Sequence, residues 1–170
     1  MKIEDYCSKL DQQLAAQEDE HRRMAVAVDA VRRVFQVSAE EVAVFSLDPE
    51  LQLICFLWPE KLQQSGLIPL SSGSSLAART IRENKAFLNN RFASTQHASI
   101  FEQVRLDKEK KDRPTPIQKI LSAPLPGDGH VKGAVQISRK GSDPVHVGAD
   151  FTKNDLAILV ELAKIISRHL

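Results

Sequence analysis

Apolar residues recur at alternating spacings of four and three at both ends of the chain, a pattern typical of heptad helices. The N-terminal seam comprises Leu10, Leu14, Gln17, His21, Met24, Val28, Val31 and Phe35. The C-terminal seam comprises Leu156, Leu159, Ala163, Ile166 and Leu170. The sequence therefore predicts one long helix over residues 3–35 and another over residues 152–170.

The length of the first predicted helix suggests that it needs a partner. At about 1.5 Å per residue, a continuous helix over residues 3–35 would be about 50 Å long. The remaining ~130 residues would form a body only about 35 Å across, so the first turns of the helix would protrude. A second copy of the chain would cover their apolar side chains. We therefore expect a homodimer through the terminal helices. The expected interface residues are Leu10, Leu14, Gln17, His21, Met24, Val28, Leu159 and Ile166. The alternative is that the first ~20 residues fray or belong to another partner.

Between the two ends, short β-forming runs alternate with turn residues. The predicted strands cover residues 42–47, 51–58, 86–89, 119–125 and 131–138. Asp48-Pro49-Glu50 and Pro126-Gly127-Asp128-Gly129 have the chemistry of hairpin turns. Further helices are predicted over residues 76–84 and 97–106, and loops over residues 107–118 and 141–149. Thr152 and Asp155 form a capping box that starts the last helix.

Two stretches of this pattern resemble the GAF domain family. The first is the closing hairpin Ser122-Ala123-Pro124-Leu125 with Gly129 and residues 131–138, and the second is the tail from Phe151 through Leu156, Leu159, Leu162 and Ile166. The resemblance spans about residues 20–170. It implies an α+β fold (an α/β/α sandwich) with a central antiparallel sheet. The terminal helices would cover one face, and short helices and loops would enclose a pocket on the other. We expect residues 1–37 to form a dimerisation helix and residues 38–170, with the helix 152–170, the GAF-like domain.

The family resemblance also implies a role. It implies a non-enzymatic sensory or regulatory domain that binds a small molecule in its pocket and signals through a dimeric helical bundle. The alternative is a protein-interaction or dimerisation module with a vestigial pocket. The sequence departs from cyclic-nucleotide-binding relatives, because no acidic pair follows Asn90-Arg91-Phe92. Asn90 itself is an amide where many relatives carry Asp. Neither cysteine is placed for a covalent chromophore.

Composition narrows the function further. The 170 residues carry a formal net charge of +1, without the basic excess of a nucleic-acid-binding surface. The longest apolar stretch, residues 51–58, is far shorter than the ~20 residues that a membrane-spanning helix needs. Residues 1–5 lack the apolar core of a signal peptide. We therefore expect a cytoplasmic domain that binds neither nucleic acid nor a membrane.

The residues that could carry chemistry are few and scattered. Some GAF proteins resemble reductases of free methionine sulfoxide, whose chemistry needs an attacking and a resolving thiol. This chain has two cysteines, and Cys55 lies in an apolar run that predicts a core position. The histidines His21, His97, His130, His146 and His169 show no ligand spacing. We therefore expect no enzyme activity, no metal and no cofactor.

The candidate ligand site is a set of polar and aromatic residues that the fold would direct inward. Strand alternation places Gln136 and Ser138 on one face of a central strand, where they need hydrogen-bond partners if they are buried. A ligand is one such partner, and a loop backbone or water is the other. Polar residues cluster after the strand 86–89, with aromatic residues as walls. The candidate ligand-binding residues are Arg79, Asn89, Asn90, Arg91, Phe92, His97, Phe101, Gln136 and Ser138.

Overall fold

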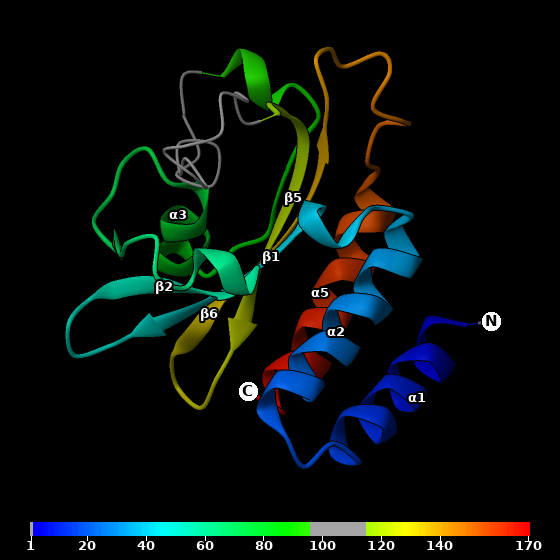
Figure 1. Cartoon of the computed structure of the whole chain (residues 1–170), viewed down its shortest axis with the longest axis vertical. Helices are drawn as coiled ribbons and strands as arrows, with labels where there is room; N and C mark the ends of the chain where they lie inside the picture. The colour runs from blue at the N-terminus through cyan, green and yellow to red at the C-terminus, as the bar shows by residue number, and fades with distance from the viewer. Residues whose placement is uncertain (1, 96–114) are drawn as a thin grey trace.

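The computed structural model describes residues 2–95 and 115–170 (Figure 1). Its helices are α1 (Ile3–Ala15), α2 (Glu20–Phe35), α3 (Leu76–Glu83) and α5 (Lys153–Ser167). Its strands are β1 (Val42–Asp48), β2 (Leu53–Trp58), β3 (Ile68–Pro69), β4 (Phe87–Asn89), β5 (Ile117–Pro126) and β6 (Val131–Lys140). Short 3-10 turns are η1 (Ala39–Glu41), η2 (Glu60–Leu62) and η3 (Phe92–Ser94). The predicted helix over residues 97–106 lies outside the described residues.

The strands form a single antiparallel sheet in the order β3-β2-β1-β6-β5-β4. Both predicted hairpins are confirmed, and β5 and β6 each extend beyond their predicted ends. The first hairpin turns where Asp48 accepts hydrogen bonds from the backbone N–H groups of Glu50 and Leu51, both at 3.0 Å. Strand β3 was not predicted, because two residues give no periodic pattern. The predicted α+β class with a central antiparallel sheet is confirmed.

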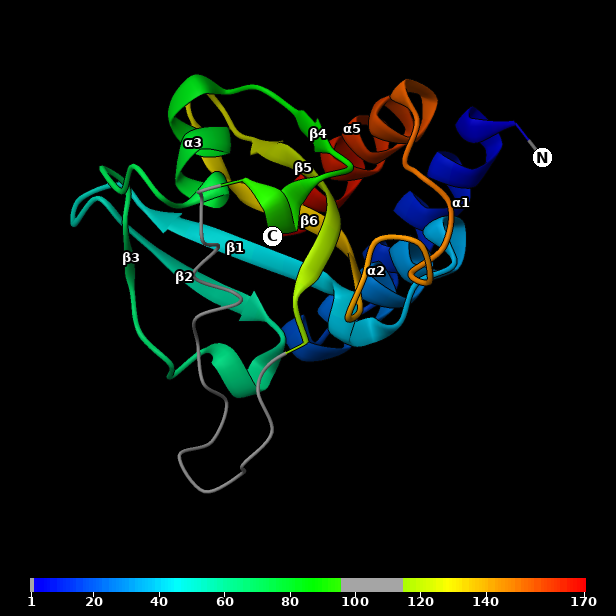
Figure 2. The same ribbon diagram turned by 90° about the horizontal axis from the view of Figure 1, so that it is seen from above.

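Helices cover the sheet on both sides (Figure 2). Helices α1, α2 and α5 lie over one side, termed here the helix face, and α3 and η3 lie over the other, termed the α3 face. Side chains of the central strands alternate between two separate cores. The helix-face core includes Val44, Leu121, Val135 and Ile137. The α3-face core includes Ala43, Phe45, Phe56, Ala78 and Ala134.

The predicted continuous helix over residues 3–35 is wrong, because the chain breaks at residues 16–19 and folds back. Asp19 caps α2 by accepting a hydrogen bond from the Arg22 N–H at 3.0 Å. Arg23 donates to the backbone oxygen of Gln17 at 2.7 Å, which stabilises the turn between the two helices. The hydroxyl of Tyr6 donates to the Ala30 oxygen at 2.9 Å and ties α1 to α2. Because α1 packs against α2 and α5, its apolar face is covered within the chain, and the reason given for a covering partner does not hold.

The residues assigned to a dimer seam have partners within their own chain. Leu10 and Leu14 are each 1% exposed because α1 packs against α2 and α5. The buried members of the set are Leu10, Leu14, Met24, Val28, Leu159 and Ile166. The polar members differ: Gln17 lies in the turn between the helices, and His21 forms an exposed ion pair with Glu60. A 3.5-residue repeat thus marks core-facing helix surfaces here, as it would for any packed helix.

A close backbone approach between β1 and β6 yields a stability prediction. A Cβ added at Gly133 would lie 1.9 Å from the backbone oxygen of Phe45. We expect Gly133→Ala to lower the free energy of unfolding by about 1–3 kcal/mol, because the two central strands must separate. Urea denaturation measures this. The control is Gly73→Ala, where a Cβ meets nothing within 4 Å and the change should be about 0.5 kcal/mol or less. Equal stability of the two variants would contradict the packing argument.

Candidate functional site

Three buried polar side chains meet on the α3 face, between α3 and the centre of the sheet. Ser122 of β5 and Gln136 of β6 face each other across the strands, and both are at most 4% exposed. The hydroxyls of Thr80 and Ser122 lie 2.7 Å apart, and the Gln136 amide donates to Ser122 at 3.2 Å. Thr80 also bonds the Leu76 oxygen, one turn earlier in α3, at 2.8 Å. This polar cluster (Thr80, Ser122 and Gln136) is surrounded by the apolar cores of the α3 face.

Phe92 forms an apolar wall near one end of this face. It is 3% exposed and packs with Ile117 and Ile120 of β5, and Leu76 of α3 is packed against the same group. Ser138 lies opposite Ile120 in the sheet, and its hydroxyl donates to the backbone oxygen of Glu41 at 3.2 Å. For Ser138 the partner is a backbone oxygen, which is one of the alternatives left open, whereas the partner of Gln136 is a neighbouring side chain, which was not among them.

Arg79 lies on the exposed side of α3. Its guanidinium pairs with Glu83 at 3.0 Å and stacks over the Phe87 ring at 4.4 Å. Both partners belong to the surface at the β4 edge of the sheet, and the Arg79 side chain is half exposed. The structure therefore separates Arg79 from the polar cluster.

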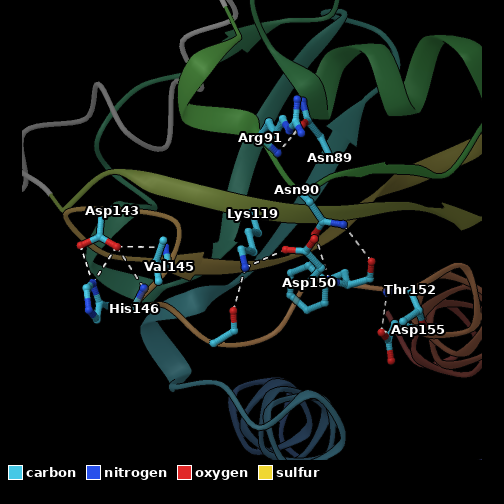
Figure 3. A network of polar contacts seen from close by, with 12 residues as sticks. Asn89, Asn90, Arg91, Lys119, Asp143, Val145, His146, Asp150, Thr152 and Asp155 are labelled. Atoms are coloured by element: carbon cyan, nitrogen blue, oxygen red, sulfur yellow. Dashed lines mark hydrogen bonds and ion pairs between the residues drawn. The ribbon is translucent and has the colours of Figure 1, made fainter.

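Asn90 connects the end of β4 to the start of α5 (Figure 3). Its amide nitrogen donates to the Phe151 oxygen at 2.9 Å, and its amide oxygen accepts from the Phe151 N–H at 2.9 Å. Asn89 instead accepts from the backbone N–H of Arg91 at 2.8 Å and shapes the turn into η3. The Asn90 side chain thus links by hydrogen bonds two segments that are 61 residues apart.

Lys119 also holds the segment that precedes α5 (Figure 3). The ammonium of Lys119 on β5 donates to the Gly148 oxygen at 2.7 Å and pairs with Asp150 at 2.8 Å. The Lys119 side chain is only 6% exposed, so the charge needs this partner. Further out in the same loop, the His146 side chain hydrogen-bonds Asp143 and holds the pKa of that carboxyl below its usual range.

The structure brings together only part of the predicted site. Gln136, Ser138 and Phe92 lie on the α3 face as expected. Arg79, Asn89 and Arg91 lie toward the surface or in turns, and His97 and Phe101 lie outside the described residues. Sequence reasoning missed Thr80 and Ser122. Ser122 lies two residues after Ile120 on β5, so the two side chains share one face of the sheet. The same spacing argument identified Gln136 on β6.

The chain's thiols are not arranged for shared redox chemistry in the described structure. Cys7 lies in α1 and Cys55 in β2 on the sheet, and both are free. Burial raises the pKa of the Cys7 thiol, which disfavours the nucleophilic thiolate. Cys55 is half-buried rather than in the core as predicted, and its sulfur lies 2.9 Å from the Ser46 hydroxyl.

The described residues form neither a cluster of metal-ligand side chains nor a helix suited to span a membrane. Within residues 2–95 and 115–170, no group of three or more His, Cys, Asp or Glu side chains is placed to hold a metal ion. In the same part of the chain, no helix has both the length and the apolar character that crossing a bilayer requires.

Solved structures share this arrangement of strands and helices. The GAF domain of an Acinetobacter phosphoenolpyruvate-protein phosphotransferase superposes with a TM-score of 0.72 at 16% identity, covering 99% of this chain and 94% of that one. The GAF domain of the Coxiella burnetii phosphotransferase gives 0.71 at 11% identity, with 98% and 91% covered. Free methionine-R-sulfoxide reductase from Neisseria meningitidis, solved with its substrate, gives 0.66 at 14% identity, with 98% and 87% covered. No sequence profile of a protein family matches the chain, nor does any curated protein. The chain has the GAF-domain fold.

Substitution of Asn90 tests the two hydrogen bonds that it forms with the Phe151 backbone. We expect Asn90→Ala to lower the free energy of unfolding by about 1–3 kcal/mol, because the N–H and oxygen of Phe151 lose their partners. The stability of Asn90→Asp should lie between those of the wild type and Asn90→Ala, since a carboxylate still accepts from the Phe151 N–H but cannot donate to the Phe151 oxygen. Urea denaturation measures stability, and hydrogen exchange at the Phe151 amide reports the local opening. The control is Asn154→Ala, an exposed residue in the first turn of α5. Unchanged exchange at Phe151 in Asn90→Ala would contradict this role.

Proposed function

We propose that this chain is a non-enzymatic sensory or regulatory domain that binds a small molecule on the α3 face of its sheet. The polar cluster carries the proposal. Polar groups in the centre of a buried sheet need partners, and few-membered polar sets in apolar surroundings are typical of small-molecule sites. The fold supports the role, because it is shared with GAF domains of phosphotransferases and with a reductase solved with its substrate.

The proposed ligand is small and largely apolar, with one or two polar groups. Phe92, Ile117 and Ile120 supply apolar contacts beside the cluster. Ser122 and Gln136 supply a hydroxyl and an amide, each able to donate and accept hydrogen bonds. In the described part of this face the cluster contains no charged side chain, so a neutral polar group suits it better than a carboxylate or phosphate.

The connection to the helical layer runs through the end of β4. Phe92, which borders the proposed site, is two residues from Asn90, and Asn90 holds the residue just before the Thr152 cap of α5. A ligand that shifts η3 would therefore pull on the start of α5. The proposed output is the set of terminal helices, and the packing of α5 along both α1 and α2 supports this.

Native mass spectrometry of freshly purified protein tests the proposal. We expect the polypeptide to carry a bound small molecule. Gln136→Met should lose it, since the substitution keeps the side-chain length and removes the amide. Circular dichroism should be unchanged. The control is Ser142→Ala, an exposed position in the loop before α5 that should retain the molecule. Bare wild-type polypeptide, or equal occupancy in Gln136→Met, would contradict the proposed site.

One observation favours the second candidate, an interaction module with a vestigial pocket. Thr80, Ser122 and Gln136 satisfy one another, so the cluster has hydrogen-bond partners without a ligand. On this alternative the cluster only stabilises the packing of α3 on the sheet. The two candidates differ in the same experiment, because a vestigial pocket predicts bare polypeptide in every preparation.

We also propose a homodimer through the terminal helices, with an interface that differs from the one expected from the sequence. The inner faces of α1, α2 and α5 are used within the chain, so a dimer must use their outward faces. Sedimentation velocity over a wide range of protein concentrations measures the assembly. Substituting Leu14 by a charged residue would not test it, because that side chain belongs to the core of the single chain. A single species with the mass of one chain at all concentrations would exclude the dimer.

A further inference from the structure

A cavity of about 590 Å³ lies on the helix face, where the start of α2 and the end of α5 meet the sheet. Figure 1 shows the C-terminal end beside the first turn of α2 and near the β5–β6 hairpin. The lining residues are Glu20, His21, Met24, Phe45, Ser46, Leu57, Glu60, Gln63, Lys132, His169 and Leu170. None of them belongs to the polar cluster on the α3 face, so this cavity is separate from the site proposed above.

The cavity combines an apolar surface with one cation that lacks a charged side-chain partner. Met24 and Leu57 provide the apolar contacts. Lys132 donates to the backbone oxygens of Ser167 at 3.0 Å and Leu170 at 3.2 Å. Within the described residues, no side-chain carboxylate forms an ion pair with Lys132. An ammonium has three N–H donors, so an anion at this position can accept the one that these two oxygens leave.

The other charged groups at the cavity are already paired or lie at its rim. His21 pairs with Glu60, and His169 pairs with Asp11 at 2.7 Å. Glu20 is exposed in the first turn of α2, where a negative charge is stabilised by the helix dipole. The remaining charge that can attract a ligand is therefore the positive charge of Lys132.

We propose that this cavity is a second binding site, which takes a small amphipathic anion such as a carboxylate or sulfonate with an apolar body. The anionic group lies on Lys132 and the apolar body on Met24 and Leu57. The occupied site touches both terminal helices at once, since α2 begins there and α5 ends there. Binding would therefore fix the end of α5 relative to the turn at residues 16–19.

Fluorescence titration with 8-anilinonaphthalene-1-sulfonate, an apolar aromatic sulfonate, tests the proposal. We expect saturable enhancement with the wild-type chain and competition by sodium decanoate. The uncharged decanol should compete about tenfold less well, which is the effect of one charge-assisted hydrogen bond. Lys132→Met should weaken probe binding by about tenfold and Lys132→Arg should retain it. The matched control is Lys153→Met, an exposed lysine at the opposite end of α5, which should bind as the wild type does.

A second variant covers the case in which Lys132→Met fails to fold. Met24→Trp fills the cavity and leaves Lys132 in place, and it should abolish saturable binding while the circular dichroism spectrum persists. Gln136→Met, on the α3 face, should leave probe affinity unchanged. Wild-type affinity in both Lys132→Met and Met24→Trp would overturn the second site. Loss of binding in Gln136→Met alone would also overturn it, because the probe would then occupy the α3 face, and the proposed function would stand.

Discussion

The central strands β1, β6 and β5 are buried on both faces, and this constraint governs the rest of the structure. Each side chain along them enters either the helix-face core or the α3-face core, where water cannot hydrate a polar group. Apolar residues satisfy this at nearly every position. Ser122, Gln136 and Ser138 are exceptions on the α3 face, and each of them has a hydrogen-bond partner. Gly133 is needed for a different reason, because a Cβ there would collide with the backbone oxygen of Phe45 in the neighbouring strand.

Elements with strong local signals could be predicted from the sequence. The turn at Asp48 and the capping box of Thr152 and Asp155 are encoded within a few residues, and both are present in the structure. The break between α1 and α2 has a weaker local signal, because residues 16–19 contain neither glycine nor proline and only the N-cap residue Asp19 marks it. It is stabilised by contacts from distant residues, including the bond from Tyr6 to Ala30. Gln17, which was expected at the dimer seam, lies in this break.

Predicting the site depended on the same distinction. Strand alternation placed Gln136 and Ser138 on one face of β6, and both side chains are buried there. Thr80 gave no comparable signal, because a threonine on a short helix is ordinary. The amide of Asn90 indicated a hydrogen-bonding role. The sequence did not show that its partner is the Phe151 backbone rather than a ligand. An amide can donate to the Phe151 oxygen and accept from the N–H of the same residue, whereas an ionised carboxylate can only accept, which explains why Asn rather than Asp serves at this position.

Apolar contacts hold the middle of α5, and polar contacts hold its two ends. Its middle is held by buried residues such as Leu159 and Leu162, whose apolar contacts are non-directional. Its ends are held by directional hydrogen bonds. Asn90 fixes the residue before the N-cap, and Lys132 fixes the backbone oxygen of Ser167 in the last turn. Lys132 lines the cavity on the helix face, and Asn90 is two residues from Phe92, which borders the proposed site on the α3 face. On the two proposals, a ligand at either site would therefore act near a hydrogen bond that holds one end of α5.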